Sequence, residues 1–327
     1  MELLIDVVLL SMLIAVALGM ALSRDMLAVI MLAGIYGLLS ANFFVAMDAV
    51  DVAFTEAAVG AGVFPLLMLA TLAIVGRHEA QPRRRVAMAL LIVVITGALL
   101  IVGTLDMPTF GSADAPVHQH VAPRYLEQSS AEIGIPNVVT SVLASYRAFD
   151  TLGEVVVIFA AGIGVLLLLS TCAPSRNSRW TDAADSAAHH KILRIVSKIL
   201  IPPILIFALY VQFHGEYSPG GGFQAGVIFA TAIILYTLFF GLRVANRVIN
   251  QAVVQILAAL GVLIYGSVGL VSLINGKAFL DYSALAQNPL LGQHLGILVI
   301  ELGVGITVAS VMILIFFAFA GRIGGRR

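Results

Sequence analysis

Nine long apolar stretches limit what this chain can fold into more than any other feature of its sequence. They lie at roughly 3–22, 26–47, 52–75, 86–105, 151–171, 195–213, 220–242, 250–274 and 292–320. A helix of about 20 apolar residues crosses a bilayer, and the alternating pattern of a membrane β-barrel is absent from these stretches. The sequence therefore predicts an all-α fold, a polytopic transmembrane helical bundle of about nine spans.

Composition agrees with a membrane protein and argues against several other classes. Hydrophobic residues make up 60% of the 327 residues, charged residues only 11%, and the mean hydropathy is +1.04. The single cysteine, Cys172, excludes a disulfide scaffold. Nucleic-acid binding is disfavoured because 18 basic residues are balanced by 18 acidic ones without a long basic run. His118 and His120 lack companions at metal-ligand spacing, and no catalytic triad is visible, so we expect no enzyme activity, metal or cofactor.

The distribution of lysine and arginine predicts the orientation of the bundle. With the N-terminus outside and nine spans, 15 of the 18 basic residues fall in inside loops. Only Arg124, Arg147 and Lys277 then remain outside. The opposite orientation would reverse this split, so we expect the N-terminus outside and the C-terminus inside.

Two polar segments divide the chain into units. Residues 106–150 form a long outer segment, and its last part, 137–147, predicts a short amphipathic helix lying at the membrane interface. The second segment, residues 172–190, consists mainly of small and polar residues and is expected on the inside. We expect a three-helix unit over 1–85, a two-helix unit with the outer segment over 86–172, a cytoplasmic linker over 173–190 and a four-helix domain over 191–327.

Glu56 is the first of three glutamates placed within apolar spans, where an ionised side chain costs about 2.5–3.5 kcal/mol on insertion scales. Pro65 lacks an N–H and, together with Gly60 and Gly62, predicts a kink or bulge in the same helix. A carboxylate beside such a break is a candidate stop on a proton or cation path. A structural hydrogen bond from Glu56 to a neighbouring helix, with the glycines as packing contacts, is an equally open interpretation.

Glu154 lies near the start of the fifth span. With Arg147 and Asp150 it predicts a charged cluster at an outer mouth of an ion path. Thr151 and Glu154 also fit a capping box, in which Glu154 would hold the start of a helix instead. The capping box is the favoured interpretation of the two.

Glu301 lies in the middle of the last span, seven residues after His294, so the two share one helical face. An ion path and a structural hydrogen bond to a partner helix are both open for Glu301. No lysine lies in the core of any span, whereas modules that relay protons along a membrane axis normally need buried lysine–glutamate pairs. We therefore expect that this chain does not pump ions alone.

The string HGEYSPGGGFQ, residues 214–224, is the most distinctive part of the sequence. Ser218 can cap the next helix, Pro219 can occupy its first position, and the three glycines permit close backbone approach or positive φ. It is not a phosphate loop, because no Gly-Lys-Ser/Thr follows. A cation site made of carbonyls is one interpretation, and tight packing against another helix or subunit is the favoured one. The candidate motif residues are His214, Pro219, Gly220, Gly221, Gly222 and Phe223.

Three strings resemble known families of membrane subunits. HGEYSPGGGFQAGVI and IELGVGITV resemble the MnhB-type subunit of multisubunit Na+/H+ antiporters, the Mrp family. DVAFTEAAVGAG resembles the MbhD-type three-helix unit, and NVVTSVLASYRAFDTLGEVVVI resembles the MbhE-type unit that ends the large Mrp A subunit. The strings fall in the three helical units above, in the order D, E, B, and cover nearly the whole chain.

The resemblance implies a fused accessory subunit of an Mrp-type antiporter, multi-pass in the plasma membrane of a prokaryote. The ions would be Na+ and H+, and the partners would be the other membrane subunits, including a separate large pump subunit. In that family the sodium path is thought to run near the D and E units. Carried over to this chain, it implicates Glu56, Arg147 and Glu154.

Three hypotheses result. The first is a subunit of a cation/proton antiporter complex that contributes an acidic ion path and a subunit interface. The second is a subunit of a related redox-driven complex, such as a membrane-bound hydrogenase. The third is a scaffold without an ion path.

Overall fold

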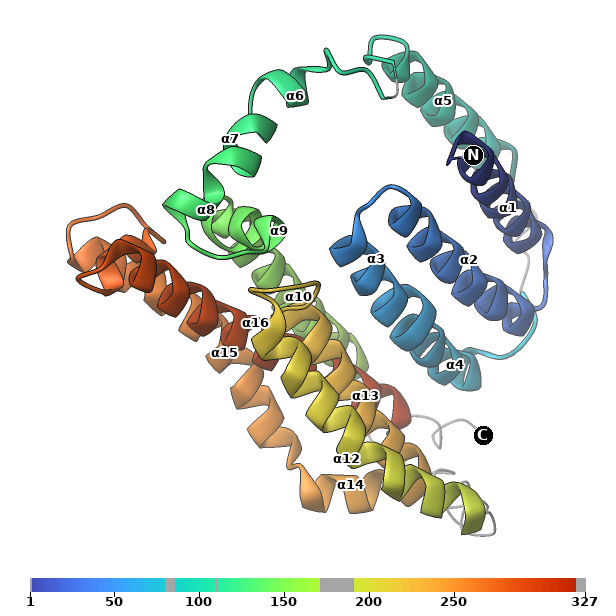
Figure 1. Cartoon of the computed structure of the whole chain (residues 1–327). Coiled ribbons are helices and arrows are strands. Elements are labelled where there is room, and N and C mark those ends of the chain that lie inside the picture. Colours follow the sequence, from blue (N-terminus) through green and yellow to red (C-terminus); the bar gives the residue numbers. More distant parts are fainter. Residues whose placement is uncertain (1, 80–85, 110, 171–190, 322–327) are drawn as a thin grey trace.

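The computed structural model describes residues 2–79, 86–109, 111–170 and 191–321 (Figure 1). Within this part, nine helices are long and apolar enough to cross a membrane and no strand is present, which confirms the predicted all-α, nine-span fold. The predicted linker, 173–190, lies outside the described residues. The spans are α1 (Glu2–Leu22), α2 (Met26–Ala46), the helix Val50–Val75, α5 (Val86–Thr104), α10 (Ala148–Ser170), α12 (Lys191–His214), α13 (Gly222–Phe240), α15 (Gln251–Ile274) and α16 (Pro289–Ala320).

The third span is not one uniform α-helix. It consists of α3 (Val50–Glu56), the π-helix η1 (Ala57–Val63) and α4 (Phe64–Val75). The π-helix closes with the Phe64 N–H donating to the Val59 carbonyl, five residues back. Because Pro65 has no N–H to donate, the preceding turn can widen without losing a further hydrogen bond.

The outer segment folds into short helices at one end of the bundle. The predicted helix over 137–147 is present as α9 (Val138–Thr140) followed by the π-helix η2 (Ser141–Tyr146), with the Asn137 side chain capping its start. Its small residues, Ser141 and Ala144, face the bundle and are buried, while its larger apolar residues lie further out. The earlier turns are α6 (Pro116–Gln119), α7 (Ala122–Glu127) and α8 (Ser129–Glu132).

Helix α16 is the centre of the C-terminal bundle. Helices α13, α15 and α10 pack along it, and α12 packs on α13. The short helix α14 (Leu242–Val248) connects α13 to α15 at the end opposite the outer segment (Figure 1). Helix α5 stands apart in the same view, and none of its residues between 87 and 104 is buried.

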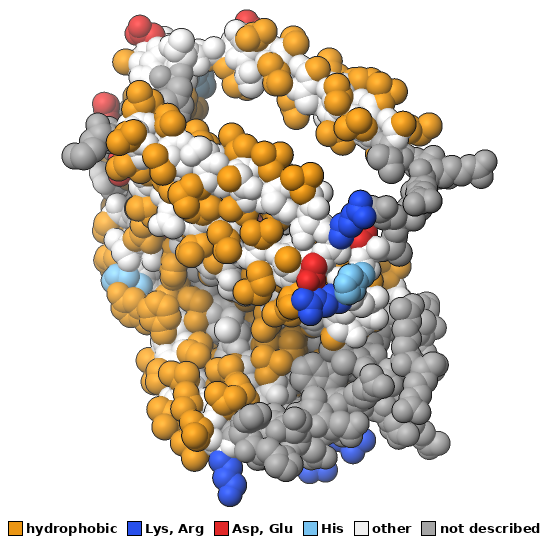
Figure 2. Space-filling model, turned by 90° about the vertical axis from the view of Figure 1, so that its right-hand side faces the viewer, with side chains coloured by type: hydrophobic (Ala, Val, Ile, Leu, Met, Phe, Trp, Pro, Cys, Tyr) orange, Lys and Arg blue, Asp and Glu red, His pale blue; other side chains and the backbone are white. Residues whose placement is uncertain are grey.

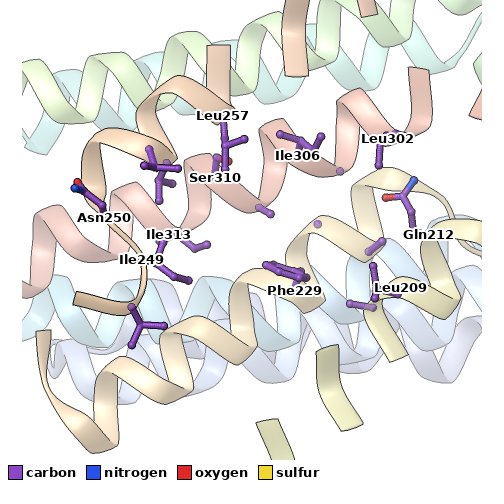
Figure 3. Close-up of a pocket in the computed structure, with 18 of the residues that line it drawn as sticks. Leu209, Gln212, Phe229, Ile249, Asn250, Leu257, Leu302, Ile306, Ser310 and Ile313 are labelled. Carbon is purple, nitrogen blue, oxygen red and sulfur yellow. The ribbon is translucent and has the colours of Figure 1, made fainter. Parts of the chain in front are cut away.

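The surface is apolar, as a bilayer and partner helices require. Figure 2 shows hydrophobic side chains spread over one face, with lysine and arginine side chains on its right side and at its lower edge. Between α12, α13, α15 and α16 the bundle also leaves a mostly apolar cavity of about 550 Å3 (Figure 3).

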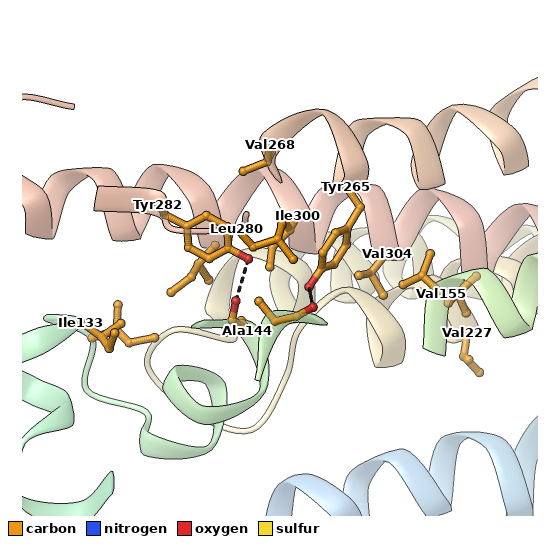
Figure 4. Close-up of a cluster of buried hydrophobic side chains, with 14 of the residues drawn as sticks. Ile133, Ala144, Val155, Val227, Tyr265, Val268, Leu280, Tyr282, Ile300 and Val304 are labelled. Atoms are coloured by element: carbon orange, nitrogen blue, oxygen red, sulfur yellow. Dashed lines mark hydrogen bonds between the residues drawn. The ribbon is translucent and has the colours of Figure 1, made fainter. Parts of the chain in front are cut away.

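Two buried tyrosines join the C-terminal bundle to η2 and to the start of α10 (Figure 4). The Tyr265 hydroxyl donates to the Ala148 carbonyl at 2.8 Å, and the Tyr282 hydroxyl donates to the Ala144 carbonyl at 2.9 Å. Tyr282 lies on the 3-10 turn η3 (Tyr282–Leu285), and burial raises the pKa of its hydroxyl. Gly296 lies directly under the Tyr282 ring, where a Cβ would collide with it.

Candidate functional site

The loop 215–221, between α12 and α13, meets two carboxylates that come from distant parts of the chain. The Gly220 N–H donates to Asp51 Oδ1 of α3 at 3.3 Å, and the Gly222 N–H donates to Glu301 Oε2 of α16. Gly222 is the first residue of α13 and Gly220 lies two residues before it, so the positive end of the dipole of this 19-residue helix lies beside these acids. The beginning of α13 therefore forms a polar centre shared by three spans.

Glu216 adds a third carboxylate to this centre. Its Oε2 lies 3.0 Å from His294 Nδ1, and its side chain is only 18% exposed. Its other oxygen, Oε1, is buried and has no hydrogen-bond partner in the described structure. Glu216 and Glu301 both line a small cavity of about 40 Å3, together with Thr140. A cavity of this size and polarity is large enough to hold one water molecule between the two acids.

Polar side chains from the outer segment fix the loop. The Asn137 amide donates to the carbonyls of Gly215 and Ser218, each at 3.2 Å. The Thr140 hydroxyl donates to the Gly215 carbonyl at 2.7 Å. These bonds hold the loop against the outer segment.

Gln224 makes the matching contact on the other side of the centre. Its amide donates to the Thr55 hydroxyl of α3 at 2.7 Å, and its side chain is buried. The start of α13 and the loop before it are therefore tied to α3 by two contacts, this one and the bond between Gly220 and Asp51.

The loop needs glycine because its backbone lies against α16. Gly221 has a φ of 109°, which favours glycine, and a Cβ there would lie 2.8 Å from the Glu301 carboxylate. A Cβ on Gly222 would collide with the Glu301 carbonyl oxygen. Of the other motif residues, His214 stacks on Tyr210, and Phe223 packs on the core. The predicted helix start, with Ser218 as cap and Pro219 in first position, is wrong, because α13 begins at Gly222 with Gly221 as its N-cap.

The structure places Glu56 away from this centre. Glu56 is half-buried at the end of α3, and its carboxylate covers Gly60 in η1. Gly60 in turn packs on the backbone of Gly37 in α2. The Glu56 carboxylate makes no hydrogen bond with any described residue, so the structural alternative of a bond from this side chain to a neighbouring helix is not found. Gly62 lies within η1, and Pro65 packs near Gly34.

Arg147, Asp150 and Glu154 form only part of the expected cluster. Arg147 and Asp150 make an ion pair of 2.5 Å with both side chains more than half exposed. Glu154 is exposed and has no ion pair within the described part of the chain. The capping-box interpretation is wrong, because α10 begins at Ala148 and Thr151 lies inside its first turns, where its hydroxyl donates to the Leu143 carbonyl at 2.7 Å.

Sequence reasoning missed most of the centre. It singled out Glu301 and the glycines, but not that Asp51 and Glu216 lie beside them, because no local pattern links residues 79 to 169 positions apart. Glu216 did carry a signal, as an acid within the most distinctive loop. In the described structure, no three histidine, cysteine or acidic side chains converge closely enough to hold a metal ion.

Three family profiles match the chain. They are the "Domain related to MnhB subunit of Na+/H+ antiporter" over residues 192–314, the D subunit of MBH over 11–77 and the E subunit of MBH over 83–185. The A/B subunit of a K+/H+ antiporter from Rhizobium meliloti is 26% identical over 94% of this chain, which spans only 33% of that relative. The antiporter subunit mnhB2 of Staphylococcus haemolyticus is 37% identical over 40% of this chain and 94% of its own length.

Two solved structures resemble the whole fold or most of it. The Mrp complex from Dietzia sp. DQ12-45-1b matches 98% of this chain and 35% of its own, with a TM-score of 0.76 and 25% identity. An archaeal membrane-bound sulfane sulfur reductase matches 71% of this chain and 96% of its own, with a TM-score of 0.55 and 29% identity. The family matches and the fold agree, and the chain belongs to the family of multisubunit antiporter subunits that carry the MnhB domain.

Proposed function

We propose that this chain is a membrane subunit of a cation/proton antiporter complex in a prokaryotic plasma membrane, with Na+ as the cation. Its division into three units over 1–85, 86–172 and 191–327, joined by the linker 173–190, belongs to the proposal. The chain contributes an acidic site and a large subunit interface, and it acts together with the other membrane subunits, including a separate large pump subunit. Its role is transport, without catalysis of a chemical reaction.

The observation that carries the proposal is the carboxylate centre at the start of α13. Glu301 and Glu216 line one small polar cavity, and Glu216 keeps a buried oxygen without a partner in the described structure. A proton or a dehydrated cation supplies the partner that such an oxygen lacks. The dipole of α13 stabilises the ionised form of the neighbouring Glu301, so loading and release can both occur at moderate cost.

In this proposal the other candidate residues lie further along the ion path or at the interface with a neighbouring subunit. Glu56 lies beside the π-helical segment with its carboxylate unpaired within the described chain. Glu154, Arg147 and Asp150 lie exposed on the outer part of α10 and the turn before it, where a neighbouring membrane protein can complete a path.

The second candidate, a redox-driven complex, is supported by the two MBH profiles and by the sulfur reductase structure. The antiporter is favoured because the Mrp structure covers more of the chain at a higher TM-score, 0.76 against 0.55. Neighbouring genes separate the two: metal-cluster subunits beside this gene would favour the redox complex.

The test is ion exchange in membrane vesicles from antiporter-deficient bacteria that express all subunits encoded beside this chain. We expect Na+ to dissipate an imposed pH gradient in these vesicles, and no exchange when this chain alone is omitted. The purified chain by itself in liposomes should not exchange Na+ for H+. Undiminished exchange without the chain would contradict its role, and exchange with K+ but not Na+ would correct the cation.

A further inference from the structure

The apolar cavity between α12, α13, α15 and α16 meets the small cavity of the carboxylate centre only at Gln212 and Phe213, which line both, and it has no part in the proposed exchange. Side chains from all four helices line it, among them Leu209, Phe229, Leu257 and Ile306. Figure 3 shows Phe229 between the two ends of the cavity, which are marked by Gln212 and Asn250. The walls between these ends are almost entirely hydrocarbon.

The size of the cavity limits what can occupy it. Its volume of about 550 Å3 lies within the roughly 300–1,000 Å3 that is usual for small-molecule sites. A transmembrane helix about 10 Å across and about 30 Å long is far larger than that. A flexible hydrocarbon chain therefore fits this space, whereas a helix from another subunit can only cover its opening.

One end of the cavity carries positive charge. Arg247 of α14 lines this end, is exposed and makes no ion pair with any described residue. Asn250 lies beside it as the N-cap of α15, so the positive end of a 24-residue helix points to the same place. Arg243 lies one turn earlier on α14 and is also exposed. An apolar slot with a cationic mouth is complementary to a molecule with a hydrocarbon tail and an anionic head.

We propose that this cavity binds one acyl chain of an anionic phospholipid, with its phosphate at Arg247 and the start of α15. The predicted orientation places Arg247 on the cytoplasmic side, where anionic lipids are abundant. A bound chain would fill the gap between α12 and α15 and so hold the four-helix bundle together.

The test uses tryptophan fluorescence of the full chain in phospholipid vesicles. Phe229→Trp is introduced in a Trp180→Phe background, which leaves one tryptophan inside the cavity. A minority of the lipid carries bromine on its acyl chain, either as phosphatidylglycerol or as phosphatidylcholine, and bromine quenches tryptophan on contact. Leu263→Trp, on the exposed surface of α15, is the matched control for ordinary bilayer contact. Leu257→Trp is a second cavity position, used if Phe229→Trp fails to fold.

We expect brominated phosphatidylglycerol to quench the cavity tryptophan more strongly than brominated phosphatidylcholine, with no such difference at the surface position. Adding Arg247→Gln should lower this headgroup preference about fivefold, since one basic residue near the surface contributes about 1 kcal/mol. Equal quenching by both lipids in the cavity would overturn the proposal. Quenching at the surface position alone would show that the cavity is closed or covered by protein, and would overturn it too.

Discussion

Glu301 lies so close to the backbone of α13 that the facing positions leave no room for a side chain. The contact at Gly222 excludes a Cβ, and Gly221 combines a positive φ with the same crowding. A carboxylate within a span is costly, and here the Gly222 N–H and the dipole of α13 offset part of that cost. The glycines of the loop are therefore required so that the backbone can approach Glu301 closely.

At this scale the sequence predicts residue types but not their neighbours. Acids in apolar spans are visible as exceptions, so Glu56, Glu154 and Glu301 could all be found. Which of them meet other acids depends on helix packing, and the sequence contains no pattern for it. Glu301 lies beside Glu216 and Asp51, whereas Glu154 is exposed, although both are single acids in apolar helices.

A pH-dependent contact can be tested at Asp25, which lies outside the spans. The Arg77 side chain forms an ion pair with Asp25 and lowers the pKa of its carboxyl from 3.8 to about 2. Because the folded-state pKa is the lower one, the stabilisation is present above about pH 3.8 and is lost as the pH falls towards 2. We expect Asp25→Asn to remove this loss of stability between pH 3.8 and 2, and the effect should be small because Arg77 is exposed and Asp25 is only partly buried. Thermal unfolding in detergent at several pH values measures this loss of stability. The same loss in Asp25→Asn as in the unchanged protein would contradict the prediction.

The elements themselves were the most predictable part of the fold. The spans are mostly apolar and 18 to 32 residues long, and their minimum length is set by the bilayer rather than by the rest of the protein. The two π-helical segments, η1 and η2, could not be predicted in the same way. Pro65 indicates that the third span departs from an ideal helix, but a hydrogen bond to the fifth residue back is one of several possible outcomes.

Two tyrosine hydroxyls hold the outer segment and the start of α10 against the bundle. Removing one of these hydroxyls should therefore lower the stability of the protein. Tyr282→Phe removes the donor to the buried Ala144 carbonyl and leaves that oxygen without it. We expect a loss of about 1–3 kcal/mol in unfolding free energy, the usual cost of a buried group left unpaired. Tyr217→Phe, at a 61% exposed position, is the matched control and should change little. Denaturant unfolding measures the free energy of unfolding of both variants. Equal values for Tyr282→Phe and Tyr217→Phe would disprove the stabilising role of the Tyr282 hydroxyl.

The whole molecule has two chemically different ends. The outer segment, the loop before α13 and the turn before α16 meet at one end, as the bonds from Asn137 and Tyr282 show. Helix α14, which carries the basic residues Arg243 and Arg247, lies at the other end (Figure 1). Basic residues gathered at one end are expected for a protein that follows the positive-inside rule. The orientation with the N-terminus outside and the C-terminus inside stays a prediction.

Cysteine labelling tests that orientation. In a Cys172→Ser background, Asn288→Cys at the start of α16 should react with an impermeant thiol reagent added to intact cells. Ser178→Cys, in the linker that lies outside the described residues, should react only after the cells are permeabilised. Labelling of Ser178→Cys in intact cells would reverse the orientation.

We propose that the carboxylate centre at the start of α13 takes part in ion exchange. The most direct measurement is Na+/H+ exchange by the assembled complex in vesicles, with Glu301→Gln and Glu216→Gln compared with Glu127→Gln, an exposed glutamate of the outer segment. Glutamine keeps the size of the side chain but cannot carry the charge. We expect both centre variants to assemble normally and to lose about tenfold or more of the exchange rate, as is usual when a proton-transfer group is removed, while Glu127→Gln keeps it. Normal exchange by assembled Glu301→Gln and Glu216→Gln complexes would contradict the account and leave the centre a structural contact between helices.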